Sequence, residues 1–284
     1  MVVRANAKIN LTLDIQRKRS DGYHDLSTVM QSLDLCDSIE LSKNRTGEII
    51  ITSNKRAVPT DSTNIAYKAA KAILDYAGIT DMGVNIHIDK VIPMEAGMGG
   101  GSADAAATIV GLINLFSLQI TESVLMEIAT GIGADVPFCL MGGTCMCEGI
   151  GEEITRIPPM PQCDILICKP PVGVSTPFAY DESDKYPQED NFMTPYMLEA
   201  LDTGDIVSVT DCISNRFDDI LHIPEVQIIK SLMRENGAIN ASMTGSGSAV
   251  YGIFNDDVAM LRVAEMLKEY GEVFLTKPTA AVNM

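Results

Sequence analysis

Long apolar runs are absent from this sequence of 284 residues. No stretch approaches the ~18 to 20 consecutive apolar residues that a helix needs to cross a membrane. Near the first residue, the charges of Arg4, Lys8, Asp14 and Arg17 interrupt any apolar core of a signal peptide. The sequence therefore predicts a cytoplasmic protein with no membrane partner.

Positive charge is scarce as well. The chain has 21 lysine and arginine residues against 38 aspartate and glutamate residues, which gives a net charge of −17. A surface of this sign repels the phosphate backbone of a nucleic acid, so we expect no nucleic-acid partner. An anionic nucleotide could still bind, provided that backbone N–H groups, a lysine or a metal ion are concentrated at one place.

Cysteines with the spacing of a disulfide framework or a zinc ribbon are missing. The seven cysteines form no CxxC pair, and their number is odd. Cys145 and Cys147 are two positions apart, which places them on one face of a strand. We interpret the cysteines as buried, reduced thiols, and we assign no metal ligand from the sequence.

Strand-like and helix-like patterns mix along the chain without a regular alternation. The length, with 46% hydrophobic residues, favours two domains. Extended runs occur at 5–15, 26–35, 47–53, 84–92, 144–148, 153–157, 163–169, 239–243, 250–254 and 272–277. Helical patterns occur at 65–78, 102–116, 121–131, 196–214, 225–236 and 257–270, and a proline- and acid-rich loop covers 170–195. We therefore predict an α+β fold, divided at the prolines of 157–161 into domains 1–157 and 158–284.

A glycine-rich loop, PMEAGMGGGSADAAA at 93–107, lies between a predicted strand and a predicted helix. Gly97, Gly99, Gly100 and Gly101 permit positive φ and carry no Cβ, so the backbone can approach a phosphate closely. The free N–H groups at the start of the following helix favour an anion. The loop is therefore predicted to bind a phosphate group, which the residues alone leave unspecified.

Other kinds of glycine loop need features that this one lacks. A Walker-type loop ends in Gly-Lys-[Ser/Thr], and the chain contains no Gly-Lys pair. A dinucleotide fingerprint needs GxGxxG, but the position three after Gly99 is Ser102. A flexible loop without a ligand stays open as an alternative.

A second glycine loop, TGSGSA at 244–249, is either a tight hairpin turn or a ligand-binding loop.

Asp135 and Lys8 are candidates for the two charged groups that phosphoryl transfer requires. Without a Walker lysine, a kinase still needs a cation near the transferred group and an acceptor for the hydroxyl proton. Asp135, in GADVPF at 133–138, and Lys8, in the first strand, meet both needs if they come together. The alternatives are a turn residue at Asp135 and a solvated lysine on the polar face that Lys8 shares with Asn10 and Thr12.

Three segments, in this order, resemble the GHMP kinases, a family that includes galactokinase, homoserine kinase and mevalonate kinase. They are AKINLTLDI at 7–15, PMEAGMGGGSADAAA at 93–107 and TGSGSAVYGIF at 244–254. RSDGYHDLSTVMQSLDLCDSI at 19–39, GADVPF at 133–138 and PPVGVSTPFAY at 170–180 are similar to a member that acts on a cytidine diphosphate derivative of methylerythritol. The resemblance covers essentially the whole chain. It implies a domain like the second domain of ribosomal protein S5, then a ferredoxin-like domain, with the site in the cleft between them.

The resemblance also implies a role for each matching position. Lys8 and Asp135 would be the catalytic pair, and Asn64 would lie near the adenine of ATP. The ATP phosphates would be wrapped by Pro93, Met94, Glu95, Ala96, Gly97, Met98, Gly99, Gly100, Gly101, Ser102 and Ala103. The substrate would be held by Asn10, Thr176 and Gly245, and its cytosine would lie between Tyr23 and His24 on one side and Tyr180 on the other.

Three positions depart from the pattern of the family. Glu95 places a negative charge in the phosphate loop, which weakens nucleotide binding unless the side chain points outward. Met98 stands where leucine is commoner. Tyr180 stands where phenylalanine can occur, and both rings can stack.

The function that the resemblance implies is an ATP- and Mg²⁺-dependent kinase of non-mevalonate isoprenoid precursor synthesis. It would phosphorylate the 2-hydroxyl of its small-molecule substrate, with Asp135 accepting the hydroxyl proton beside Lys8. One alternative is another GHMP small-molecule kinase, such as homoserine kinase. The other is a catalytically silent sensor of a nucleotide and a metabolite. We expect the protein to be a monomer or a homodimer.

Overall fold

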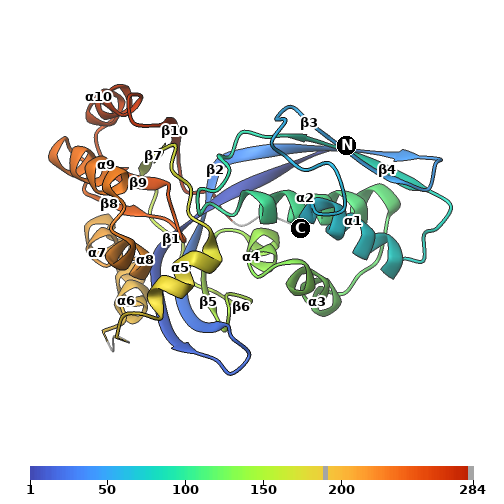
Figure 1. The fold of residues 1–284 in the computed structure, drawn as a ribbon, viewed down its shortest axis with the longest axis horizontal. Helices are drawn as coiled ribbons and strands as arrows, with labels where there is room; N and C mark the ends of the chain where they lie inside the picture. The colour runs from blue at the N-terminus through green and yellow to red at the C-terminus, as the bar shows by residue number, and fades with distance from the viewer. Residues whose placement is uncertain (188–190, 281–284) are drawn as a thin grey trace.

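Two β-sheets with helices packed against them make up this computed structural model, which describes residues 1–187 and 191–280 (Figure 1). The strands of one sheet all come from residues before 157, and those of the other all come from residues after 163. Both halves mix strands and helices, so the predicted α+β class is confirmed. The domain boundary at 157–161 stays a prediction.

The first sheet is built on two long antiparallel strands, β1 (Val2–Lys18) and β2 (His24–Asn44). Its order is β3-β4-β2-β5-β6, and β1 lies beside β2. The shorter strands are β3 (Ile49–Ser53), β4 (Gly83–Asp89), β5 (Thr144–Glu148) and β6 (Glu153–Arg156). One face carries the helices α1 (Ile65–Tyr76), α2 (Gly100–Phe116), α3 (Glu122–Ile132) and α4 (Val136–Met141), as Figure 1 shows.

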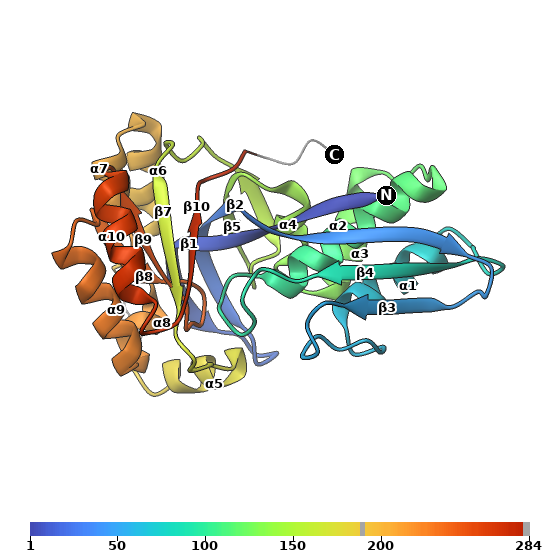
Figure 2. The same cartoon turned by 90° about the horizontal axis from the view of Figure 1, so that it is seen from above.

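The second sheet is antiparallel, with the order β10-β7-β9-β8. Its strands are β7 (Asp164–Lys169), β8 (Asn240–Met243), β9 (Val250–Phe254) and β10 (Glu272–Thr276). The helices of this half are α5 (Thr176–Ser183), α6 (Thr194–Thr203), α7 (Ile206–Asp211), α8 (Arg216–Leu221), α9 (Pro224–Glu235) and α10 (Asp257–Leu267). In chain order the sheet reads 4-1-3-2, which is the ferredoxin-like arrangement. Figure 2 shows this sheet beside the end of the first one, with α9 and α10 on its far side.

β1 is buried on both faces, although its alternating pattern predicts one polar face in solvent. Ile9 and Leu11 belong to the main cluster of buried apolar side chains. On the other face, Asn10 N–H donates to Thr244 Oγ1 at 3.0 Å, and the hydroxyls of Thr12 and Thr194 lie 2.8 Å apart. The polar face thus packs against the second half of the chain. A strand that joins two packed halves has no solvent face at that point.

The segment 170–195 contains helices, so its prediction as a loop is wrong. Ser175 caps α5 by accepting the N–H of Phe178, but α5 buries only Ala179 and therefore carries no apolar periodicity. The predicted helix 196–214 is two helices, because Gly204 ends α6 in the left-handed region and Asp205 caps α7. Residues 188–190 of the predicted loop lie outside the described residues.

The seven cysteines are free, as expected, but only three of them are fully buried. Those three include Cys145 and Cys147, the pair predicted to share a face of β5. Burial raises the pKa of the Cys145 thiol to about 11, so it stays protonated near neutral pH.

In the part of the chain that is described, no helix is both long and apolar enough to cross a membrane.

Candidate active site

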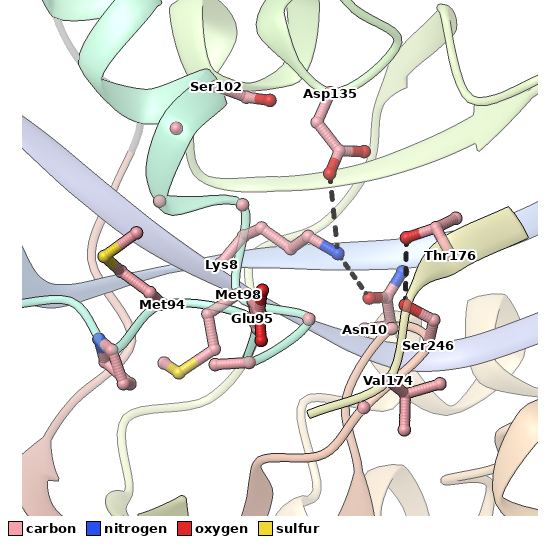
Figure 3. Close-up of a pocket in the computed structure, with 18 of the residues that line it drawn as sticks. Lys8, Asn10, Met94, Glu95, Met98, Ser102, Asp135, Val174, Thr176 and Ser246 are labelled. Carbon is pink, nitrogen blue, oxygen red and sulfur yellow. Dashed lines mark hydrogen bonds and ion pairs between the residues drawn. The ribbon is translucent and has the colours of Figure 1, made fainter. Parts of the chain in front are cut away.

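A cavity of about 570 Å³ lies between the two halves of the molecule, and the two glycine loops both line it (Figure 3). Its other walls include residues of β1 and β2 and the starts of α1, α4 and α5. Side chains far apart in the sequence therefore meet here. A cavity of this size is in the usual range for a small-molecule site.

Lys8 and Asp135 face each other across this cavity. Lys8 is buried in β1, where its Nζ lies 3.8 Å from Asp135 Oδ2 and donates a 2.7 Å hydrogen bond to Asn10 Oδ1 (Figure 3). Asp135 holds the N-cap position of α4, yet its side chain caps no N–H group. The Asp135 side chain is 31% exposed, so a ligand can reach it. Lys8 is thus not a solvated lysine, and the turn position of Asp135 leaves its carboxylate free for other contacts.

The first glycine loop enters α2 with its backbone turned by two glycines in the left-handed region. Gly97 has φ 72° and Gly99, the N-cap of α2, has φ 66°. No side chain caps α2, so its first N–H groups are left for a ligand at the cavity. Ten of the eleven predicted loop residues line the cavity. The exception is Ala103, whose side chain is buried in the core and whose N–H donates to Gly99 O.

Gly99 also sits directly against the catalytic candidates. A Cβ at Gly99 would lie 3.0 Å from Lys8 Cγ and 3.7 Å from Asp135 Oδ2. The loop that is predicted to hold phosphates is therefore in contact with the pair that is predicted to transfer one. The Lys8 N–H also donates to Met98 O at 3.1 Å, which fixes the loop to β1.

The second glycine loop is both a hairpin turn and part of the cavity wall. It joins the antiparallel strands β8 and β9, and Gly245, at φ 55°, lines the cavity. The loop packs on the first one: Ala249 N–H donates to Ala96 O at 3.2 Å, and Thr244 Oγ1 donates to Gly97 O at 3.3 Å. The two glycine loops therefore form one unit that spans both halves.

The side chain of Asn64 already makes two hydrogen bonds at the start of α1. Its Oδ1 accepts the N–H of Ala66 at 2.8 Å, and its Nδ2 donates to Pro59 O at 2.7 Å. Asn64 lines the cavity, as a neighbour of adenine would. Its side chain shapes this wall as a helix cap, and contact with adenine stays a prediction.

Glu95 points towards the segment that precedes α5. It is exposed and has φ 50°, a region that residues other than glycine rarely adopt. Its Oε2 lies so close to Gly173 that a Cβ there would be 2.5 Å away. Burial lowers the pKa of nearby Lys169, while the charge of Glu95 raises it. The carboxylate thus faces a neighbouring segment and a lysine as well as the cavity.

The predicted cytosine sandwich is not formed in this structure. His24 and Tyr180 stack on each other, with ring centres 4.8 Å apart and planes 16° from parallel, which leaves no room for a base between them. Tyr23 is 60% exposed and does not line the cavity. Tyr180 is not a surface aromatic, since it lines the cavity and packs edge-on against Phe217 at 5.0 Å.

Thr176 and Asn10 both line the cavity, between the Lys8–Asp135 pair and the second glycine loop (Figure 3), and their contact with a substrate stays a prediction. The hydroxyls of Thr176 and Ser246 are 3.1 Å apart. Asn10 Nδ2 donates to Thr28 Oγ1 at 2.8 Å, so both ends of the Asn10 amide are held. Polar groups thus converge on the space beside Asp135.

A buried ion cluster under the first glycine loop escaped the sequence analysis. Lys90 Nζ donates to Asp37 Oδ2 at 2.6 Å and to Asp104 Oδ2 at 2.7 Å, and Asp37 Oδ1 accepts the N–H groups of Val91 and Ile92. Asp104 Oδ1 has no partner among the described residues. Burial raises the pKa of Asp104 to about 8, against the opposing pull of Lys90. The feature of the sequence that could have indicated this cluster is Asp104, an aspartate among the alanines on the buried face of α2.

Comparison with known proteins matches both halves of the chain to one family. The model of the GHMP kinases N terminal domain matches residues 64–143, and that of GHMP kinases C terminal matches residues 197–273. A 4-diphosphocytidyl-2-C-methyl-D-erythritol kinase from Caldicellulosiruptor saccharolyticus is 43% identical over 279 residues, which covers 97% of this chain and 96% of that protein. The chain belongs to the GHMP kinase family. Another kinase of the same name, from Clostridium acetobutylicum, is 40% identical to this GHMP kinase over 280 residues, covering 98% and 99% of the two chains.

Solved structures agree on the fold of this GHMP kinase. A crystal structure of 4-(cytidine 5'-diphospho)-2C-methyl-D-erythritol kinase matches with a TM-score of 0.82 and 30% identity, covering 99% of this chain and 100% of that one. A homoserine kinase from Cytophaga hutchinsonii matches with a TM-score of 0.74 and 18% identity, covering 99% and 94%. The predicted two-domain GHMP kinase fold is thereby confirmed.

Proposed function

We propose that this chain phosphorylates the 2-hydroxyl of 4-diphosphocytidyl-2-C-methyl-D-erythritol with ATP, the kinase step of non-mevalonate isoprenoid precursor synthesis. The relatives at 40% to 43% identity over nearly the whole chain carry the name of this kinase. The observation that supports the chemistry is the meeting of Lys8 and Asp135, 3.8 Å apart, in one cavity with the first glycine loop.

In the proposed reaction, the substrate hydroxyl lies beside Asp135. As its oxygen bonds to the γ-phosphorus of ATP, the bond to the leaving oxygen of ADP breaks and the hydroxyl proton passes to Asp135. Lys8, held in place by Asn10, offsets negative charge at the reacting centre. The free N–H groups at the start of α2 hold the phosphates.

Mg²⁺ belongs to the proposal because kinases use it to neutralise the phosphates. Among the described residues, no three His, Cys, Asp or Glu side chains form a group that could hold a metal. Asp135, Ser102 and Glu95 bear oxygen atoms and line the cavity. This set fits a Mg²⁺ ion that keeps most of its contacts to ATP and water and takes one or two from the protein.

The test is a coupled assay of ADP formation with ATP, Mg²⁺ and one acceptor at a time. We expect ADP only with the cytidyl substrate, and none with homoserine or mevalonate. Turnover with homoserine instead would make the protein another GHMP kinase. Binding of ATP without turnover of any acceptor would make it a sensor.

We also infer a cytoplasmic enzyme that acts on a small molecule, as a monomer or a homodimer, with no nucleic acid or membrane as partner. The seven free cysteines suit a reducing compartment. The net charge of −17 disfavours contact with nucleic acid.

A further inference from the structure

Asp184 directly follows α5, the helix whose Thr176 and Tyr180 line the cavity. Its carboxylate contacts both strands of the β1–β2 hairpin next to the turn, because Oδ1 lies 2.8 Å from His24 Nε2 and Oδ2 forms an ion pair with Lys18. Lys18 ends β1, and His24 begins β2. One side chain thus ties the helix that carries Thr176 and Tyr180 to the hairpin that carries His24.

Helix capping does not explain the presence of Asp184. A negative charge at the C-terminal end of a helix is opposed by the helix dipole. The hydrogen bonds from Lys18 and then from His24 lower the pKa of Asp184, so the carboxylate is ionised at neutral pH. Lys18 and His24 stabilise the charge of Asp184, and this charge does not stabilise α5. The contacts of Asp184 therefore connect the end of α5 to the β1–β2 hairpin.

The hydrogen bond to Asp184 decides which nitrogen of His24 is left for a ligand. An ionised carboxylate only accepts, so Nε2 carries the hydrogen, and in the neutral ring Nδ1 is an acceptor. Nδ1 has no hydrogen-bond partner among residues 1–187 and 191–280. Stacking on Tyr180 also fixes the plane of the ring. The buried His24 thus has one free acceptor with a set direction.

We propose that Asp184 is a positioning residue that makes the site prefer cytosine, by holding His24 with Nδ1 as an acceptor. Cytosine carries an amino donor at the place where uracil carries a carbonyl oxygen. Two acceptors that face each other are both left unpaired, so a site with this tautomer rejects uracil. The inference rests on the proposed cytidyl substrate.

The first test compares CDP and UDP binding by calorimetry. We expect wild type to bind CDP at least about tenfold more tightly than UDP, the low end of what one good base contact gives. Asp184→Ala should bring this ratio close to one, while Asp184→Asn, which can still accept from Nε2, should keep part of it. Asp181→Ala removes an exposed carboxylate from the same helix and should leave the ratio unchanged. ATP affinity should be unchanged in all three variants.

A second readout needs no variant. The chain has three histidines, so the ring ¹⁵N resonances can be assigned one by one. We expect the neutral ring of His24 to carry its hydrogen on Nε2 and to leave Nδ1 bare. The opposite tautomer, or an unchanged CDP to UDP ratio in folded Asp184→Ala, would overturn the role of Asp184 alone. Wild type that binds neither CDP nor UDP would overturn the cytidyl substrate and the role of Asp184 together.

Discussion

Asp135 stands at the start of a helix and caps nothing there, which leaves its carboxylate to the cavity. We expect Asp135→Asn to lower kcat by at least ~100-fold, because the amide cannot accept the hydroxyl proton. ATP affinity and Tm should change little, since the amide keeps the shape of the carboxylate. Steady-state kinetics, calorimetry and thermal unfolding measure the three quantities.

The matched control for this variant is Asp202→Asn, which removes an exposed carboxylate on α6. It should leave kcat unchanged. Near-normal turnover in Asp135→Asn would remove Asp135 from the reaction. A large drop in Tm would instead assign it to the structure of the turn.

Asp104 gives a prediction about pH, because its pKa of about 8 lies well above the value for an unfolded chain. Between about pH 4 and 8, the unfolded state has lost this proton while the folded state still holds it, so Asp104 costs the folded protein stability as the pH rises through this window. Asn at this position does not titrate and can still accept from Lys90. The Tm of Asp104→Asn minus that of wild type should therefore grow from pH 5 to pH 8 and then level off.

Thermal unfolding at a series of pH values measures this difference. A difference that does not depend on pH would mean that Asp104 stays ionised in the folded state throughout. The ion pair with Lys90 would then outweigh burial.

At the scale of elements, the first glycine loop depends on its contact with the second one. A Cβ at Gly97 would lie 2.0 Å from Thr244 O, and Gly97 has φ 72°. Gly97→Ala should therefore push the loops apart and weaken ATP binding by at least about tenfold, which corresponds to 1.4 kcal/mol. Calorimetry with ATP measures the loss.

Gly131→Ala is the control for Gly97→Ala. Gly131 lies in α3, where an added Cβ meets nothing within 4 Å. This change should leave ATP affinity unaltered and raise stability by about 0.5–1 kcal/mol, since alanine favours a helix. Unchanged ATP affinity in folded Gly97→Ala would rule out the loop as the phosphate cradle.

The elements differ in how far their sequences predict them. The alternation of β1 and the strand–loop–helix order around Gly99 are local patterns, and both are confirmed. α5 is not predictable in this way, because a helix that buries only Ala179 shows no apolar period. The stacking of His24 on Tyr180 is likewise invisible locally, since nothing in either segment tells whether two rings enclose a base or meet each other.

At the scale of the whole molecule, the site exists only because the two halves pack together. Lys8 and Asp135 are far apart in the sequence, and no local pattern shows that they meet. The same is true of Lys90, whose partners lie on β2 and α2. The resemblance to GHMP kinases named the catalytic pair, and the structure adds the buried cluster and Asp184, for which the residues alone gave no spacing or motif.

The measurement that tests the proposed function most directly follows the phosphoryl group itself. Wild-type protein is incubated with 4-diphosphocytidyl-2-C-methyl-D-erythritol, Mg²⁺ and ATP labelled at the γ-phosphate, and the products are identified by ³¹P NMR. We predict one ADP for each new phosphomonoester at the 2-hydroxyl, and none with Asp135→Asn. Label released only as inorganic phosphate, or found on another hydroxyl, would contradict the proposed transfer.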